Sequence, residues 1–203
     1  MPTTARFPTA IGECALSWTD LGLTGFALPA LPHFPSRSAA RERDDPQSAS
    51  VSVAPLARAA IPPAPSPARA PLASSLPPLA SCPPAIAAII ARVQRHLAGD
   101  LQDFADLAYD WSRVTEFQSR VLRAVLTIHP GRTATYGDPA RALGAKPGAA
   151  RAIGGAVGAN PWPLLIPCHR ILGAGGKLTG YSAPGGLATK ARLLALEGIE
   201  LAG

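Results

Sequence analysis

The N-terminal part of the chain shows hydrophobic patterns of two kinds, one typical of strands and one typical of a helix. Residues 7–12 and 14–29 look like two short strands, with a turn at residues 20–22. Further along, apolar residues recur at helical spacing over residues 85–97, which predicts an amphipathic helix. Residues 104–111 alternate roughly between apolar and polar and predict another strand. Together these patterns predict a small sheet accompanied by a helix.

The C-terminal part, from residue 113 to the end, has mainly helical patterns. Thr115 is expected to cap a helix that Pro130 and Gly131 terminate. A final helix is expected over residues 188–197. The buried stripe of the first of these helices is expected to comprise Phe117, Val121, Leu122, Val125, Leu126 and Ile128.

A proline-rich stretch separates the predicted sheet from the predicted helix that follows it. Twelve of the 23 prolines lie within residues 35–84, mixed with Ala and Ser, and no hydrophobic period survives there. Such a composition is typical of a flexible linker. We therefore expect an N-terminal sheet-and-helix domain made of residues 1–34 and 85–111, a flexible insert over residues 35–84, and a C-terminal domain over residues 112–203.

The positive charge is concentrated in the C-terminal part. The whole chain carries a net charge of +6, from 19 basic and 13 acidic residues. Between Arg113 and Arg192 there are 11 basic residues against Glu116 and Asp138, a balance of +9, so the remainder sums to −3. A solvated surface of uniform charge would not show this asymmetry. It favours a nucleic-acid partner for the C-terminal part.

Composition excludes several classes of protein. With 203 residues, 47% of them apolar, the chain can form a real core, and it has neither a collagen period nor sustained heptads. Cys14, Cys82 and Cys168 are too few for a disulfide-stapled fold and lack the spacing of metal ligands. The uncharged run over residues 70–91 contains five prolines, which a membrane helix would not tolerate. We expect a soluble, cytoplasmic, bacterial protein that is monomeric and uses no cofactor or metal.

Two short helical patterns have the spacing of a helix-turn-helix. They cover residues 136–143 and 148–157, with a turn at residues 145–147. The second has no Asn, Gln or Ser to read base edges and bears one long charged side chain, Arg151, among Ala and Gly. A smooth helix can approach a narrow groove closely, and one arginine can fill the gap left by an extruded base. The alternative is a small-residue helix packed in a core, with Arg151 at its rim.

The segment before Cys168 is expected to follow an extended, stiff path because prolines stand at positions 161, 163 and 167. A tight turn at Asn160 would anchor it. A cysteine on such a segment, next to His169 and Arg170, is a candidate thiolate, since positive neighbours lower the pKa of a thiol.

His169 is expected to act on Cys168 through a water. Adjacent side chains seldom point the same way, so direct contact between the imidazole and the sulfur is not expected. Glu197, on the final helix, is the natural carboxylate to orient the imidazole.

These residues resemble those of a known family. The run AARAIGGAVGANPWPLLIPCHRI over residues 149–171, together with Gly180-Tyr-Ser and the later Leu-Leu-Ala-Leu-Glu-Gly, resembles the methylated-DNA–protein-cysteine methyltransferases, which are O6-alkylguanine DNA alkyltransferases. The resemblance is strong over residues 113–200 and looser over residues 7–29. It implies an α+β fold with a ribonuclease-H-like N-terminal sheet and a C-terminal winged-helix domain.

The resemblance also implies a reaction. Cys168 would accept a methyl or other alkyl group from O6 of a flipped guanine, irreversibly and once per molecule, in DNA bound through the minor groove. In this family pattern Arg151 resembles the arginine that fills the vacated stack, and Tyr136 the tyrosine that reaches guanine N3. His169 and Glu197 resemble a water-bridged relay behind the thiolate.

The remaining implied roles concern the walls of the guanine pocket. Asn160 resembles the asparagine that holds the turn, and Tyr181 and Ser182 match the loop that faces the O6 edge. The carbonyls of Cys168 and Ile171 would accept the guanine amino group, and the side chain of Val157 would form part of the apolar wall.

Three features depart from the family pattern. Pro139 stands where the family usually has an apolar residue, so that Asp138 would cap the helix and Tyr136 could shift. The loop that begins at Tyr181 is longer than its shortest family versions. The proline-rich insert is atypical, and the zinc-ligand set of some family members is missing from the sequence.

Two other functions remain open at this point. One is a catalytically silent DNA-binding regulator that senses alkylation, against which the presence of Cys168 argues. The other is a cysteine hydrolase, against which the adjacency of Cys168 and His169 argues.

Overall fold

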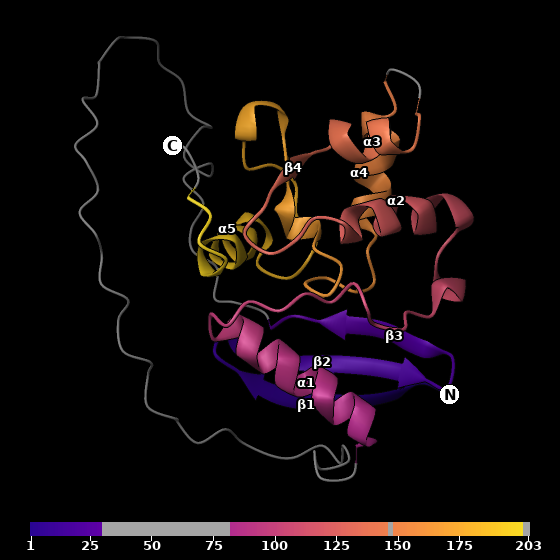
Figure 1. Ribbon diagram of the computed structural model, residues 1–203, viewed down its shortest axis with the longest axis vertical. Coiled ribbons are helices and arrows are strands. Elements are labelled where there is room, and N and C mark those ends of the chain that lie inside the picture. The colour runs from indigo at the N-terminus through magenta and orange to yellow at the C-terminus, as the bar shows by residue number, and fades with distance from the viewer. Residues whose placement is uncertain (30–81, 146–147, 201–203) are drawn as a thin grey trace, which may run out of the picture. The chain divides into compact units, whose positions relative to one another are not determined.

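The computed structural model describes residues 1–29, 82–145 and 148–200 (Figure 1). Its elements form a small antiparallel sheet with one helix, followed by a mainly helical part. The expected flexible insert lies outside the described residues except for its last three, of which Pro84 already begins a helix. Within the described ranges, no helix is long and apolar enough to cross a membrane.

The N-terminal sheet has three antiparallel strands rather than the two expected. They are β1 (Thr3–Thr9), β2 (Gly12–Thr19) and β3 (Gly22–Ala27), paired in that order. The chain turns between β1 and β2 and again, as expected, between β2 and β3. Gly12 and Gly22 end these turns with φ values of 127° and 133°, in the region that favours glycine. At Gly22 a Cβ would also lie 2.6 Å from the carbonyl oxygen of Ala108.

Helix α1 (Pro84–Leu97) lies across one face of this sheet (Figure 1). It confirms the helix expected from the apolar spacing and begins one residue earlier, at a proline, whose missing N–H is not needed in a first turn. Its buried side chains, which form one stripe, are Ile86, Ile90, Val93, His96 and Leu97.

The strand expected over residues 104–111 is wrong. The segment forms one parallel bridge, between Leu23 and Tyr109, through bonds from Leu23 N to Ala108 O (2.8 Å) and from Asp110 N to Leu23 O (2.9 Å). Pairing stops there because the Asp110 carboxylate accepts from the N–H of Ser112 and turns the chain into the short helix η3 (Trp111–Arg113).

Helix α2 (Glu116–Leu126) begins as expected, since Thr115 Oγ1 accepts from the N–H of Gln118 at 3.2 Å. It ends four residues before Pro130, so Ile128 lies outside the helix. Phe117 is 46% exposed and does not belong to the buried stripe, which consists of Val121, Leu122 and Val125.

The remaining elements belong to the helical part, which also carries the segment with Cys168. Asp138 lies inside the first turn of α3 and accepts from the N–H and hydroxyl of Thr135, so it is not the cap, and Tyr136 occupies that position. In chain order the elements are β4 (Ala134–Thr135), α3 (Gly137–Ala142), α4 (Ala150–Gly158), η4 (Cys168–Arg170), β5 (Ile171–Leu172), η5 (Ala174–Gly176) and α5 (Gly186–Leu196), with β4 and β5 parallel.

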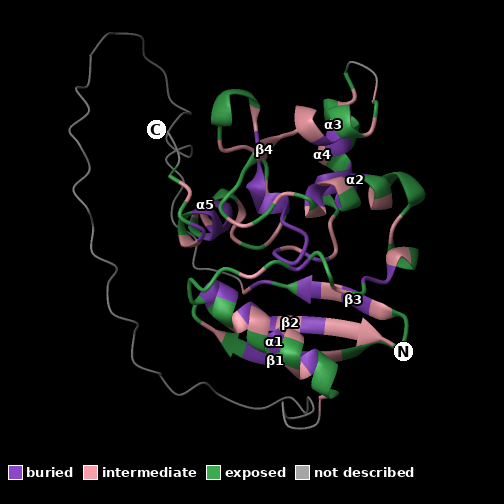
Figure 2. Cartoon of the chain, in the orientation of Figure 1, coloured by how far each residue is buried: buried purple, intermediate pink, exposed green. Residues whose placement is uncertain are grey.

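One continuous core joins the sheet to the helical part, as the buried residues in Figure 2 show. Trp162 is fully buried, stands edge-on to the ring of Tyr109 and donates from Nε1 to Leu23 O at 2.9 Å. The N–H of Phe26, on β3, donates to Pro161 O at 2.9 Å. The edge of the sheet is therefore bonded directly to the segment that leads to the cysteine.

Candidate active site

Cys168 lies in the wall of a pocket of about 280 Å³ and is 6% exposed. The pocket is formed by the residue before α3, by α4, by the first residue of η4 and by the loop before α5. It is lined by Tyr136, Gly154, Val157, Gly158, Cys168, Gly180, Tyr181 and Ser182. The structure thus brings five of the predicted site residues to one cavity from four separate segments.

The segment leading to Cys168 is a compact turn and not the extended path that its prolines suggested. The N–H of Ile166 donates to Trp162 O at 2.8 Å, and Leu164 has a φ of 75°, which is strained for a residue with a side chain. Asn160 holds this turn, because Oδ1 accepts from Trp162 N and Nδ2 donates to Ile166 O, both at 2.9 Å. Proline fixes φ but leaves ψ free, so three prolines do not by themselves make a segment extended.

Burial raises the pKa of the Cys168 thiol, contrary to the expectation that positive neighbours lower it. The polar side chains of Asn160 and Tyr181 and the charge of Lys190 act in the opposite direction but do not outweigh burial. Arg170 contributes nothing here because its guanidinium is bonded to Glu197. The thiol is therefore protonated at rest and needs a base.

His169 is fully buried behind the cysteine, and its Nε2 lies 3.0 Å from Glu197 Oε1, as expected for an oriented imidazole. Its other ring nitrogen, Nδ1, is buried and has no hydrogen-bond partner among the described residues. Since Glu197 is an acceptor, Nε2 carries the proton and Nδ1 has the free lone pair. Burial lowers the pKa of His169, while Glu197 raises it.

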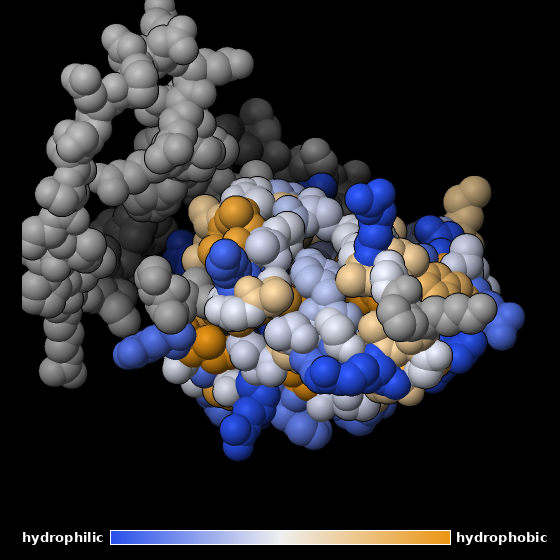
Figure 3. Space-filling model, turned by 90° about the horizontal axis from the view of Figure 1, so that it is seen from above, coloured by the Kyte–Doolittle hydropathy of each residue, from blue (hydrophilic) through white to orange (hydrophobic). Residues whose placement is uncertain are grey.

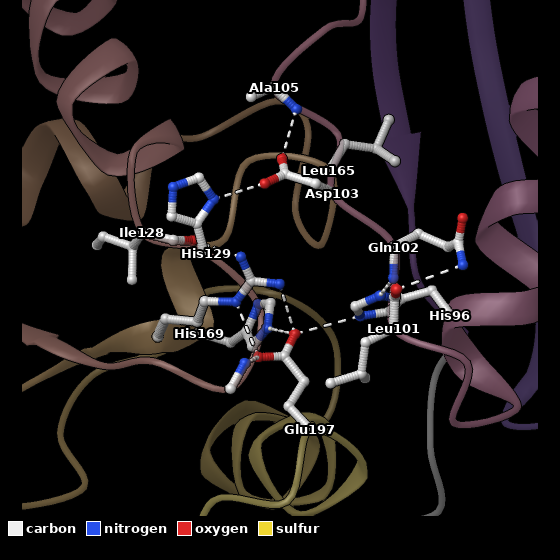
Figure 4. A network of polar contacts seen from close by, with 12 residues as sticks. His96, Leu101, Gln102, Asp103, Ala105, Ile128, His129, Leu165, His169 and Glu197 are labelled. Atoms are coloured by element: carbon white, nitrogen blue, oxygen red, sulfur yellow. Dashed lines mark hydrogen bonds and ion pairs between the residues drawn. The ribbon is translucent and has the colours of Figure 1, made fainter.

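Glu197 is the residue after the last turn of α5, and it accepts from more groups than the sequence suggested (Figure 4). Besides His169, it accepts from Arg170 through both oxygens, from His96 Nε2 at 3.2 Å, and from the N–H of Gly131 at 3.4 Å. Sequence reasoning missed His96 and the true partner of Arg170. A signal existed for His96, because it follows Val93 by three positions on the buried stripe of α1.

Lys190 is a second residue that sequence reasoning missed. It is fully buried on α5, and its Nζ donates to the carbonyls of Ile171, Thr179 and Gly180. Burial lowers its pKa to about 8. The ammonium ties strand β5 to the start of the pocket loop, and it occupies one acceptor position of the Ile171 carbonyl to which the resemblance assigns a substrate contact.

Tyr181 and Ser182 line the pocket, whereas Arg151 lies outside it. Ser182 donates from Oγ to Gly158 O, and the hydroxyl of Tyr181 is buried without a partner among the described residues. Arg151 is exposed and does not line the pocket, but it lies on the same face of α4 as Gly154 and Gly158, three and seven residues further along.

A second cavity, of about 380 Å³, also reaches Cys168 and shares Gly158 and Ser182 with the first. It extends toward Pro163 and the end of β3 at Phe26. Cys168 therefore borders both cavities.

The exposed basic residues of the C-terminal part number eight among the described residues. Arg170 and Lys190 are buried and contribute nothing to the surface. Figure 3 looks onto the α3 and α4 end, where strongly hydrophilic side chains stand around paler residues. The exposed set is Arg113, Arg120, Arg123, Arg132, Arg141, Arg151, Lys177 and Arg192.

Comparison with known proteins gives a consistent group of relatives. A family model described as "6-O-methylguanine DNA methyltransferase, DNA binding domain" matches residues 116–199. A methylated-DNA–protein-cysteine methyltransferase of Mycolicibacterium paratuberculosis is 50% identical over 115 residues, which cover 57% of this chain and 67% of that protein. One of Methanothermobacter thermautotrophicus is 40% identical over 123 residues, covering 61% and 67%. The crystal structure of Mycobacterium tuberculosis OGT in complex with DNA is similar with a TM-score of 0.63 at 32% identity, covering 97% of this chain and 93% of that one.

Proposed function

Since this chain belongs to the methylated-DNA–protein-cysteine methyltransferase family, we propose that it repairs DNA by moving an alkyl group from O6 of guanine to its own Cys168. The observation that carries this proposal is the position of Cys168 in the wall of a pocket between two short helices and a loop. A nearly buried thiol there can meet a base only if the base leaves its stack.

The proton of the thiol must move before the sulfur can attack. We assign it to His169 Nδ1, which is buried with a free lone pair, through one water between sulfur and ring. Glu197 accepts from Nε2 and stabilises the imidazolium that forms. Its carboxylate stays ionised because the hydrogen bonds it accepts outweigh the cost of burial and hold its pKa well below the usual range.

The transfer itself is a displacement at carbon. The Cys168 thiolate forms a carbon–sulfur bond while the bond between that carbon and guanine O6 breaks, and its electron pair goes to the base. The base then takes up a proton, which in this proposal comes from Tyr136, a residue of the pocket wall. The thioether has no good leaving group, so each molecule acts once.

Recognition of the base rests on the pocket walls. Val157 provides apolar surface, and the Tyr181–Ser182 loop faces the O6 edge. The carbonyls of Cys168 and Ile171 accept from the guanine amino group, each using the lone pair that its intramolecular bond leaves free. The second cavity gives an alkyl group larger than methyl a place beside the sulfur.

DNA approaches through the minor groove, along α4. Gly155 and Gly158 have open space where a Cβ would stand, so the backbone of this helix can come close to the duplex. Arg151 enters the stack where the guanine leaves it. In this proposal α3 and α4 are the helix-turn-helix of a winged-helix domain, the N-terminal sheet is ribonuclease-H-like, and one monomer acts on one lesion.

Intact mass tests the proposal. Wild-type protein incubated with an equimolar duplex containing O6-methylguanine should gain one methyl mass, and the DNA should lose it. Cys168→Ser should gain nothing yet bind the duplex, whereas Cys14→Ser, a matched change at another buried cysteine, should react fully. The assignment would be rejected if the mass of the wild type did not change, or if Cys168→Ser also gained a methyl mass. Either result would reopen the regulator and hydrolase alternatives.

A further inference from the structure

One oxygen of Glu197 is shared by three side chains from two distant parts of the chain (Figure 4). Oε1 lies 3.0 Å from His169 Nε2, 2.6 Å from Arg170 Nη2 and 3.2 Å from His96 Nε2. His169 and Arg170 belong to the cysteine segment, whereas His96 comes from the helix that covers the N-terminal sheet. His96 is 1% exposed, so this contact is made away from water.

The backbone fixes the protonation of His96. The N–H of Gln102 donates to His96 Nδ1 at 3.0 Å, so Nδ1 must carry a lone pair. The single proton of a neutral ring is then on Nε2, which donates it to Glu197 Oε1. A charged His96 would have to give up the bond from Gln102, and the ring is further held against Phe104, with centroids 5.4 Å apart.

Two neutral imidazoles therefore donate to the same carboxylate oxygen, and they compete for its negative charge. We propose that His96 is a positioning residue for alkyl transfer, which holds Glu197 and limits the charge that this carboxylate offers to His169. This inference rests on the proposed function, because His169 must be neutral in the resting protein to accept the proton of Cys168.

The groups that face His169 agree with this role. They are Cys168 beside it, Arg170 on η4, Glu197 after α5 and His96 on α1. Burial lowers the pKa of His169, Glu197 raises it, and the charge of Arg170 lowers it again. Without the N–H that His96 donates to Glu197, more of the carboxylate charge acts on His169 and raises this pKa. His169 then becomes protonated, and useless as a base, at a higher pH.

The pH profile of single-turnover transfer tests the proposal in the full-length protein. The rate is measured at saturating O6-methylguanine duplex for wild type, His96→Phe and His96→Gln. For His96→Phe we expect the pH of half-maximal rate on the acid side to rise by about half a unit, with little change on the alkaline plateau. His96→Gln keeps an N–H donor and should follow the wild type. His129→Gln is the matched control, because His129 pairs with Asp103 at the exposed edge of the same network and does not touch Glu197.

The outcomes separate this inference from the proposed function. If wild type transfers and His96→Phe has the wild-type midpoint, or loses rate equally at every pH, the role of His96 is wrong while the function stands. If wild type transfers nothing, the function itself fails.

If His96→Phe does not fold, the role of His96 can still be tested on the wild-type protein. Nitrogen-15 histidine spectra should show His96 as a neutral ring protonated on Nε2 at pH 7, with the signal assigned by its loss in His96→Gln. A charged ring, or a proton on Nδ1, would overturn it.

Discussion

Arg170 holds Glu197 by both carboxylate oxygens, with Nε 2.8 Å from Oε2 and Nη2 2.6 Å from Oε1, and both residues are buried. This bidentate pair lies directly behind the reactive cysteine. Arg170 also donates from Nη1 to Ile128 O at 2.6 Å, so the pair ties the end of α5 to the segment that follows α2. The charge of this arginine thus supports the relay instead of the thiolate.

Replacing Glu197 with Gln should cost about 3 kcal/mol of unfolding free energy at pH 7, because it leaves the buried Arg170 without a counter-charge. The wild-type carboxylate has a pKa held well below its ordinary value. Its contribution is therefore present above about pH 4.5, the unfolded value, and is lost as the pH falls further. Urea unfolding at pH 7 and pH 4 should show the gap between the two proteins narrowing at the lower pH.

Glu13→Gln is the matched control for this experiment. Glu13 pairs with Arg6 at 3.2 Å on the surface, so its loss should change stability by less than about 0.5 kcal/mol at either pH. A gap for Glu197→Gln that stays constant with pH would contradict the ion-pair interpretation.

Arg151→Ala should slow repair of duplex DNA by about tenfold or more, because unstacking a base costs a few kcal/mol and about 1.4 kcal/mol corresponds to tenfold in rate. Reaction with free O6-benzylguanine, which needs no base flipping, should hardly change. Stopped reactions analysed by intact mass give both rates. Arg192→Ala removes an exposed arginine from α5 and should slow duplex repair far less. Equal slowing of both substrates by Arg151→Ala would instead give this residue a role in the fold.

DNA affinity should fall steeply with salt and depend little on sequence. Among the described residues of the C-terminal part, eight basic side chains are exposed, and each phosphate they neutralise releases counterions. With about four phosphate contacts, log affinity should fall with a slope of about −3.6 against log salt. Fluorescence titration on two unrelated duplexes measures it. A flat response, or strong preference for one duplex, would exclude binding through the backbone.

Lys190→Met should destabilise the fold by about 2 kcal/mol, because the carbonyls of Ile171 and Thr179 lose a buried donor. Alkyl transfer should slow as well, since the same ammonium holds the start of the loop that carries Tyr181. Chemical unfolding and single-turnover rates report the two effects. Lys177→Met, at an exposed lysine, should leave the stability and the transfer rate unchanged. Equal effects from the two substitutions would refute the role of the buried Lys190 ammonium.

Local pattern was enough to predict helix α1 and the capped start of α2, because both depend on spacing and on one hydroxyl. Local pattern gave the wrong conformation where contacts with residues distant in the sequence determine the backbone path. Residues 104–111 had the alternation of a strand but found only one bridge, at Tyr109, before Asp110 turned the chain. The prolines around Trp162 suggested extension, and Asn160 folds that segment into a turn instead.

The site was predictable only as far as its residues lie in one motif. The cysteine, its histidine and the glutamate could be paired from sequence, and Glu197 does bond His169. His96 lies about a hundred residues before Glu197, outside the motif that contains Cys168, and nothing in the sequence pattern indicates that the two side chains meet. From the sequence, Lys190 counts only toward the basic balance of the C-terminal part and Arg170 is expected to act on Cys168, because a sequence does not show that a long cation is buried among carbonyls or against a carboxylate.

The bonds that join the sheet to the cysteine segment use backbone groups of β3, namely the carbonyl of residue 23 and the N–H of residue 26. Main-chain atoms are the same in every residue, apart from the N–H that proline lacks. A substitution on this strand therefore leaves both hydrogen bonds available, provided that the strand keeps its register, that residue 26 does not become proline, and that the buried positions Leu23 and Phe26 still fill the core. The attachment of this sheet to the cysteine segment therefore depends on the backbone path of β3 more than on the identity of its residues.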